Sequence, residues 1–123
     1  MSLVSISIPP IVPVKLYGPN GMRVIDALVD TGATYCIVSS EDARILGYKL
    51  LKSKSVSIVT AGGIIQAPIL KLNRIEAAGV SRTSVETLVK DLPSIRIQAI
   101  LGWSFLDKFS LRIDPKRKVL EIS

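Results

Sequence analysis

The feature of this sequence that most constrains its fold is the even spread of turn-forming residues between short apolar segments. Seven prolines and eight glycines are distributed along the 123 residues without any repeat. The segments between them alternate apolar and polar residues, as in 3–8, or form short apolar runs. Alternation with a period of two is typical of a half-buried β-strand, and frequent Pro and Gly interrupt long helices. We therefore predict many short strands joined by turns.

Several pairs of apolar segments flank turn residues and are predicted to form β-hairpins. The predicted strand pairs are 14–17 with 22–29, 56–60 with 64–72, 70–75 with 84–89, and 111–113 with 118–122. A first strand over 3–8 is predicted to end at the prolines that follow it, Pro9, Pro10 and Pro13. Together these segments predict an all-β fold.

Two short helices are predicted within this β framework. Ser39 can act as the N-cap of a helix over 40–46, because a hydroxyl and early acidic residues favour a helix start. Later in the chain, an almost unbroken apolar strand over 95–101 leads to Gly102. The apolar pattern that follows predicts a second short helix within 103–109.

The length and composition fit one folded domain covering residues 1–123. A chain of 123 residues, 48% of them hydrophobic, can bury a core but is too short for two typical domains. No apolar run reaches the roughly 18 to 20 residues needed to cross a bilayer, and the N-terminus has neither a basic start nor a cleavage site. We therefore expect a cytoplasmic protein with no membrane partner.

The absence of histidine excludes several kinds of active site. The sequence has no His and a single cysteine, Cys36. Ser-His-Asp and Cys-His nucleophiles, and nearly all zinc sites, need an imidazole or several cysteines. We therefore expect no metal and no cofactor. Cys36 itself is predicted to be a small buried hydrophobic residue.

The net charge of +6 makes a basic β-barrel that binds nucleic acid one candidate function. The sixteen Lys and Arg residues are dispersed, however, with short clusters only at 49–54 and 116–118. Proteins that bind single strands interleave basic residues with stacking aromatic ones, and only 5% of this chain is aromatic. This function therefore ranks third, and we predict no nucleic-acid partner.

The tripeptide Asp30-Thr31-Gly32 carries the most information about chemistry. It follows the apolar strand predicted over 22–29, where a carboxylate is costly to bury unless hydrogen-bond donors or a second carboxyl group compensate it. Such an aspartate can serve as an acid or a base. It can also be a turn residue whose side chain binds its own backbone amides, which is the commoner role of an isolated Asp-Thr-Gly.

Two further features accompany this tripeptide. The hairpin predicted around Gly62-Gly63 comes next, and 70 residues after Gly32 the chain has Ile100-Leu101-Gly102 before the second short helix. In this order and spacing, the sequence resembles the retropepsin-like aspartic proteases over 14–122. The resemblance implies an all-β closed barrel with one or two short helices, active as a two-fold homodimer that hydrolyses peptide bonds.

The resemblance assigns roles to three groups of residues. Asp30 corresponds to the catalytic aspartate, Thr31 to the residue whose hydroxyl bonds across the dimer, and Gly32 to the glycine that lets the loop turn. The tip of a hairpin that covers the substrate, called the flap, corresponds to Thr60, Ala61, Gly62 and Gly63. The strand that passes behind the catalytic loop corresponds to Ile100, Leu101 and Gly102.

Aspartic proteolysis requires two carboxyl groups that share a proton around one water molecule. The sequence has one Asp-Thr-Gly and no Asp-Ser-Gly, so the second carboxyl has to be Asp30 of a symmetry mate. The prediction is a homodimeric aspartic endopeptidase with water as the nucleophile and an extended peptide as the substrate, active at acidic to mildly acidic pH. The alternative is a non-catalytic dimeric peptide-binding or dimerisation module on the same fold.

Two positions depart from the viral members of this family. Those enzymes commonly have an Asp two residues after the motif's Gly and an Arg directly after the later Gly, where this chain has Thr34 and Trp103. Cellular or prokaryotic members look closer. Trp103 is predicted to pack in the core at the start of its short helix. The terminal segments 3–8 and 119–122 are predicted to pair across the dimer axis, because bare strand edges promote aggregation.

Overall fold

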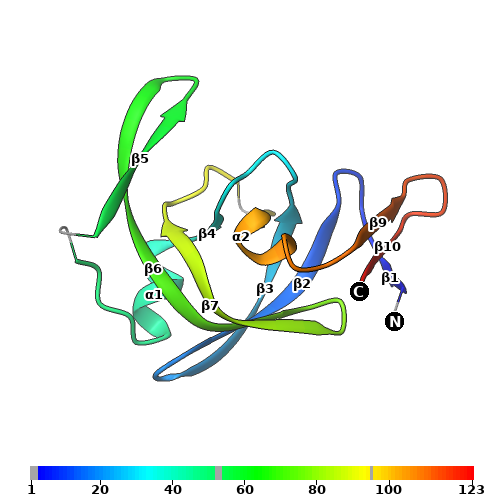
Figure 1. Cartoon of the computed structure of the whole chain (residues 1–123), viewed down its shortest axis with the longest axis horizontal. Helices are drawn as coiled ribbons and strands as arrows, with labels where there is room; N and C mark the ends of the chain where they lie inside the picture. The colour runs from blue at the N-terminus through cyan, green and yellow to red at the C-terminus, as the bar shows by residue number, and fades with distance from the viewer. Residues whose placement is uncertain (1–2, 52–53, 95) are drawn as a thin grey trace.

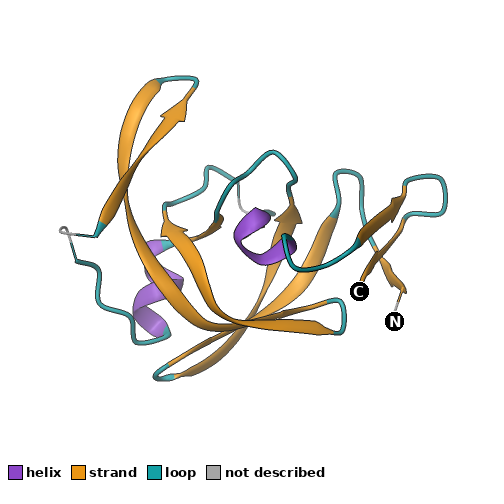
Figure 2. Cartoon of the chain, viewed as in Figure 1, coloured by secondary structure: helices purple, strands orange, loops and turns teal. Residues whose placement is uncertain are grey.

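The computed structural model describes residues 3–51, 54–94 and 96–123, which form a mainly β structure with two short helices (Figure 1; Figure 2). The helices are α1 (Ser40–Ile45) and α2 (Trp103–Leu106). The strands are β1 (Leu3–Ser5), β2 (Ile11–Gly18), β3 (Gly21–Val29), β4 (Cys36–Val38), β5 (Ser55–Thr60), β6 (Gly63–Ala77), β7 (Val80–Val89), β8 (Ala99–Leu101), β9 (Leu111–Asp114) and β10 (Val119–Ile122). No helix in these three ranges is long and apolar enough to cross a membrane.

Hydrogen bonding closes the large sheet into a barrel. Its strand order is β2-β3-β8-β4-β7-β6-β5, and β2 also pairs with β6, residues 14–17 opposite 74–77. A closed ring therefore forms from β2, β3, β8, β4, β7 and β6. Among the described strands, β5 joins this ring through β6 alone and projects from it (Figure 1). The closed all-β barrel expected from the sequence is confirmed.

Tight hairpins build most of the barrel, as predicted. The hairpins β2–β3, β5–β6 and β6–β7 each close with a two-residue loop. Gly21 and Gly63 have φ angles of 132° and 118°, which residues with a side chain rarely adopt. The predicted strands over 64–72 and 70–75 merge into the single strand β6 of 15 residues. One long strand therefore belongs both to the barrel and to the projecting hairpin.

Pro13 lies inside β2 and does not end the first strand, so that prediction is wrong. It pairs with Asp26 of β3, whose N–H donates to Oε1 of Gln98 (2.9 Å) instead of to β2. The pair therefore occupies a non-hydrogen-bonded position of the antiparallel ladder. At such a position no carbonyl of β3 needs an N–H from residue 13, so a proline fits there. The first strand, β1, ends at Ser5, before its predicted end at Ile8.

Helix α1 begins where the sequence predicts. The N-cap Ser39 accepts a hydrogen bond from the Asp42 N–H (3.1 Å), and the Ser40 N–H donates to the Asp91 carboxylate (3.0 Å). Asp42 is buried and forms an ion pair with Arg23 of β3 (2.7 Å). These contacts satisfy N–H groups of the first turn and fix α1 against the β2–β3 hairpin.

Strand β8 is shorter than the predicted strand over 95–101, whose first residue lies outside the described part of the chain. The Ser94 hydroxyl accepts hydrogen bonds from the N–H groups of Arg96 (3.2 Å) and Ile97 (3.4 Å). Local bonds of this kind compete with a strand ladder. The part that remains regular, Ala99–Leu101, is the part that lies between β3 and β4.

The apolar core lies inside the barrel and under α2. Phe105 and Leu106 of α2 are fully buried, and Cys36 is 1% exposed, which confirms its prediction as a buried hydrophobic residue. Trp103 is 44% exposed, so the prediction that it packs in the core is wrong. The helix turns Phe105 and Leu106 inward, whereas Trp103 and Asp107, one turn apart, are exposed on the other face.

The two chain ends form a separate three-stranded sheet with the order β1-β10-β9 (Figure 1). The β9–β10 hairpin is as predicted. After its turn, β10 runs back beside β9 and meets β1 of the same chain, with Leu3 opposite Glu121 and Ser5 opposite Val119. Within the described residues both edges of β10 are therefore occupied in one chain, whereas β1 is an edge strand of this sheet. The pairing of the terminal segments across a dimer axis stays a prediction.

Candidate active site

Strand β8 holds the two ends of the loop that contains Asp30. β3 ends at Val29 and β4 begins at Cys36, and β8 lies between them, parallel to β3 and antiparallel to β4. The Asp30 N–H donates to the carbonyl of Leu101 in β8 (3.1 Å). The fold thus brings the predicted site residues 30–32 together with 100–102 at one end of the barrel (Figure 1).

The Asp30 carboxylate is oriented by its own loop. Its Oδ1 accepts a hydrogen bond from the Gly32 N–H (2.8 Å), and its backbone carbonyl accepts one from the Ala33 N–H (3.2 Å). This is the geometry of a turn aspartate whose side chain binds a backbone amide of its own loop. Asp30 is half-buried and Thr31 and Gly32 are exposed. Oδ2 has no hydrogen-bond partner among the described residues, so the turn uses only one of the two carboxylate oxygens.

Gly102 allows the backbone to pass directly behind this loop. A Cβ atom at this position would lie 2.5 Å from the Tyr35 carbonyl oxygen and 2.7 Å from that of Ala33. The next two N–H groups, those of Trp103 and Ser104, donate to carbonyls of the same loop (both 2.9 Å). The end of β8 and the start of α2 therefore support the loop from behind, which is the place that the resemblance implies for this strand.

A cleft of about 330 Å³ opens beside the loop. One wall consists of residues 32–35 together with Ile37 and Leu88, and the other consists of residues 57–59 of β5. Gly32, whose N–H holds the Asp30 carboxylate, belongs to this lining, and none of the lining residues is charged. A larger hollow of about 400 Å³, lined by Tyr48 and Glu86 among others, contains none of the predicted site residues.

The predicted flap tip lies at the end of the β5–β6 hairpin and does not line the cleft. Residues 60–63 form the turn, where the Thr60 hydroxyl donates to the Gly63 carbonyl (2.8 Å). The flap residues that do line it, Ser57, Ile58 and Val59, were missed. Their strand was visible in the sequence as an alternating pattern, but which part of it faces the loop depends on how far the hairpin reaches over the barrel.

The floor beneath the loop is neutral. The Cys36 N–H donates to Oγ of Ser104 (2.9 Å), and burial raises the pKa of the Cys36 thiol, which therefore stays uncharged at neutral pH. Asp30 is the only acidic residue between Asp26 and Glu41. Within the described ranges, no three His, Cys, Asp or Glu side chains gather into a group that could hold a metal ion. The Asp30 carboxylate is thus the acidic group that this site offers.

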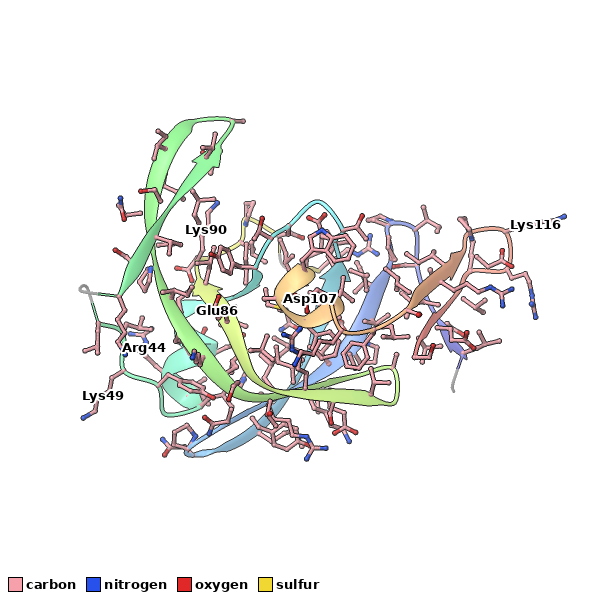
Figure 3. All side chains as sticks on the ribbon, in the orientation of Figure 1. Arg44, Lys49, Glu86, Lys90, Asp107 and Lys116 are labelled. Carbon is pink, nitrogen blue, oxygen red and sulfur yellow. The ribbon has the colours of Figure 1, made fainter. Side chains whose placement is uncertain are left out.

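Charged side chains are spread over the molecule. Lys49 and Lys116, one from each of the two basic clusters seen in the sequence, lie at opposite ends (Figure 3). Lys52 of the first cluster lies outside the described residues. Asp107, labelled in Figure 3 and directly following α2, pairs with Arg82 of β7. The basic clusters therefore do not combine into one surface.

Comparison with known proteins agrees with this geometry. The family described as "Aspartyl protease" matches residues 12–105, which contain the Asp30 loop, the flap and β8. No curated protein gave a significant match. The crystal structure of a retropepsin-like aspartic protease from Rickettsia conorii is similar over 98% of this chain and 87% of that chain, with a TM-score of 0.66 and 24% sequence identity. This chain therefore belongs to the aspartyl protease family and has a retropepsin-like fold.

Proposed function

We propose that this chain is a homodimeric aspartic endopeptidase in which residues 1–123 form one protease domain. Membership of the family and the fold support a general aspartic protease function. The observation that carries the proposal is the Asp30 carboxylate, which Gly32 orients through Oδ1 beside the cleft, while Oδ2 is unpartnered in the described part of the chain. The proposed nucleophile is water, and no cofactor takes part.

The proposed reaction needs a second carboxyl group from an identical chain. One carboxylate takes a proton from a water molecule, and the other carboxyl, which is protonated, donates to the carbonyl oxygen of the scissile peptide bond. Each chain supplies one Asp30, so a two-fold axis has to pass between two Asp30 loops. At about 3 Å two carboxylates do not both ionise, so the pair retains one proton. Activity is therefore expected at acidic to mildly acidic pH.

The proposed substrate is an extended peptide between the flap and the loop. β5 is the last strand of its sheet and can add a further strand through its backbone groups. Ile37, Ile58 and Leu88 give the cleft apolar contacts for a substrate side chain. In this proposal the flap tip closes over the bound peptide with Thr60, Ala61, Gly62 and Gly63. Thr31 bonds across the two-fold axis. The catalytic loop is held by Ile100, Leu101 and Gly102.

The test compares the wild type with Asp30→Asn and with the matched control Asp26→Asn. Asp26 is an exposed aspartate four residues earlier. Each chain is incubated with a broad peptide library between about pH 3 and 6, with and without a pepstatin-type inhibitor. We expect the wild type and Asp26→Asn to cleave, and Asp30→Asn to lose cleavage by about three orders of magnitude while it still folds and dimerises. Equal cleavage by the wild type and Asp30→Asn would contradict the proposal and favour the dimeric peptide-binding module.

A further inference from the structure

A second hollow lies between strand β6 and the loop that follows α1. Its volume of about 400 Å³ is within the range of ligand sites, and none of its described lining residues belongs to the cleft beside Asp30. The lining comes from the loop, from β6 and from β7, and consists of Tyr48, Lys49, Leu51, Lys54, residues 69–71 and Glu86. We call this hollow the β6 groove.

The β6 groove borders a stretch of β6 that has a strand on one side only. β6 pairs with β5 through residues 63–68 and with β2 through residues 74–77. In the described part of the chain, residues 69–73 between these two pairings have β7 as their strand partner and no strand on the opposite edge. A short free edge is therefore present in the middle of the longest strand.

The loop after α1 covers the two ends of this free edge and leaves its middle open. The Ile69 N–H donates to the Lys54 carbonyl (2.8 Å). The Asn73 N–H donates to the Tyr48 hydroxyl (2.8 Å). Backbone groups of alternate residues in a strand point to the same edge, so the N–H and C=O of Lys71 also point to this side. An extended peptide in the groove can therefore pair with Lys71 through two backbone hydrogen bonds.

The charge of the β6 groove favours an acidic ligand. Lys49, Lys54 and Lys71 line it together with one acidic residue, Glu86, whereas the described lining of the Asp30 cleft is uncharged (Figure 3). Every ion pair among the described residues is formed by an arginine, so none of the three lysines is neutralised by a carboxylate. The lining therefore attracts carboxylates that lie between the lysines.

The β6 groove and the Asp30 cleft are neighbours across one strand pair. Ile69 of the groove lies directly opposite Leu88 of the cleft in the β6–β7 ladder. Side chains at directly opposite positions are about 5 Å apart. One extended polypeptide can therefore reach both places. The groove is concave and has a free strand edge, which fits a polypeptide better than the flat surface of a membrane.

We propose that the β6 groove binds an acidic, extended segment of the protein substrate, outside the segment that is cleaved. The inference rests on the proposed function, because the substrate is what brings a polypeptide to the neighbouring cleft. The bound segment pairs with the backbone of Lys71, and its carboxylates face the ammonium groups of Lys49 and Lys54. Its apolar side chains contact Leu51 and Ile69. Substrates with acidic residues beside the cleaved segment are then preferred.

The first test measures binding without cleavage. The Asp30→Asn chain is titrated into a fluorescein-labelled peptide of alternating Glu and Leu residues, with a pepstatin-type inhibitor present in excess to occupy the cleft. We expect this peptide to bind at least about tenfold more tightly than the same peptide with Gln in place of Glu, and to be weakened by added salt. Equal affinities for the two peptides would overturn the inference, and so would displacement of the acidic peptide by the inhibitor.

The second test changes the charge of the groove in both directions. Lys49→Gln/Lys54→Gln/Lys71→Gln should raise the dissociation constant of the acidic peptide about 30-fold, which is about threefold for each lysine. Glu86→Gln should lower it about threefold, a gain that damage to the fold cannot produce. The matched control removes three exposed positive charges elsewhere and should leave the dissociation constant unchanged: Lys108→Gln/Lys116→Gln/Arg117→Gln. Equal effects of the two triple variants would overturn the inference.

A backbone-methylated peptide tests the pairing with Lys71. N-methylation of alternate residues keeps the carboxylates of the acidic peptide but removes the N–H groups that a strand edge needs, so binding should weaken about tenfold when the methyl groups face β6. Unchanged binding would overturn the strand pairing. Vesicles of phosphatidylserine and phosphatidylcholine are tested in parallel. Vesicle binding that is lost in the triple lysine variant, without any binding of the acidic peptide, would overturn the inference in favour of a membrane contact.

Cleavage then connects the β6 groove to the substrate. Two peptides share one scissile sequence and carry either Glu-rich or Gln-rich extensions at both ends. We expect the wild type to cleave the acidic peptide with about tenfold higher kcat/KM, through a lower KM, and the triple lysine variant to lose this preference while it cleaves a short peptide without extensions normally. Equal kcat/KM for both extended peptides would overturn the inference while the proposed function stands. Absence of Asp30-dependent cleavage would contradict the proposed function, and the binding measurements would still decide whether the groove takes an acidic peptide.

Discussion

At Gly102, the absence of a side chain lets two segments of backbone pass in contact. Gly102→Ala would place a Cβ atom 2.5 Å from the Tyr35 carbonyl oxygen and 2.7 Å from that of Ala33. Neither oxygen can rotate away as a side chain would, because both belong to the backbone of the loop. We expect Gly102→Ala to lower the free energy of unfolding by about 3 kcal/mol in urea denaturation and to abolish peptide cleavage.

Gly62→Ala is the matched control for this prediction. A Cβ atom at Gly62 would have its nearest neighbour, Oγ1 of Thr60, at 3.9 Å. The free energy of unfolding of Gly62→Ala should therefore stay within about 0.5 kcal/mol of the wild type. If Gly102→Ala proved as stable as Gly62→Ala, the close approach behind the loop would be refuted.

The buried thiol of Cys36 is expected to make the free energy of unfolding depend on pH in the alkaline range. Burial raises the pKa of its thiol above the ordinary value of 9.0, because the thiolate is disfavoured in the core. The unfolded chain therefore loses this proton at lower pH than the folded chain. The contribution of the thiol proton to the free energy of unfolding is complete below about pH 9. It is lost as the pH rises toward the folded-state pKa, by up to about 1.4 kcal/mol per pH unit.

Urea denaturation of the wild type and Cys36→Ala between about pH 7 and 10.5 measures this effect. Cys36→Ala should lack the part of the alkaline decline that the thiol causes. Burial also raises the pKa of Tyr48, but this residue is present in both chains and cancels in the difference. Two curves that remain parallel over the whole range would show that the thiol does not titrate as its burial requires.

At the scale of elements, substitutions in the flap are expected to change peptide cleavage without changing the stability of the fold. Val59 and Ile64 lie directly opposite each other in the β5–β6 hairpin and are 82% and 72% exposed. Val59 lines the cleft, and Ile64 is not part of that lining. Neither side chain is part of the core, so Val59→Ser and Ile64→Ser should each change the free energy of unfolding by no more than about 0.5 kcal/mol.

Val59→Ser is expected to lower kcat/KM for peptide cleavage about tenfold, because the bound peptide loses an apolar contact in the cleft. Ile64→Ser should lower it much less, since its side chain is not part of the cleft wall. Steady-state kinetics on one cleaved peptide measures both. Equal losses in the two variants would be incompatible with the cleft lining described here.

Elements with local signals could be predicted from the sequence, and elements shaped by distant contacts could not. The hairpins and α1 follow from turn residues, alternation and the Ser39 cap, all of which act within a few positions. Pro13 was assigned wrongly because its place in β2 depends on the register with β3, which puts it opposite Asp26 at a non-hydrogen-bonded position, and on β6, which pairs with β2 only from residue 14 onward. The shortening of β8 depends on the Ser94 hydroxyl, a competition that an apolar pattern does not reveal.

The residues of the candidate site also differ in whether a local sequence signal marks them. Asp30 and the segment 100–102 could be found because the tripeptide and the later glycine are contiguous signals with a characteristic order. Residues 57–59 could not, since the reach of the flap is a property of the folded hairpin. Trp103 was assigned to the core because a helix of four residues has too few positions to define a buried face by periodicity.

At the scale of the whole molecule, one chain completes its fold but supplies only half of the proposed site. The β2–β6 pairing closes the barrel within a single chain, and the terminal sheet is also internal. The Asp30 loop, by contrast, lies at one end of the barrel with exposed, uncharged neighbours. Folding should therefore be independent of protein concentration, whereas cleavage should depend on the concentration of dimers.

Mixing wild-type and Asp30→Asn subunits tests whether the active site needs two chains. The Asp30→Asn chain keeps every surface of the wild type, so the two chains should form mixed dimers when they are combined and allowed to exchange. A mixed dimer has one carboxyl and cannot share a proton between two, so it should be inactive. With equal amounts and random pairing, about half of the wild-type chains are in mixed dimers, and the rate per wild-type chain falls to about one half.

A tenfold excess of Asp30→Asn should reduce the rate per wild-type chain further, to about one eleventh, because nearly every wild-type chain then has an inactive partner. The dependence on mixing ratio distinguishes pairing from simple dilution, since dilution with an inert protein leaves the rate per wild-type chain unchanged. A rate that stays constant at every ratio would falsify the two-chain site, because a single Asp30 would then suffice.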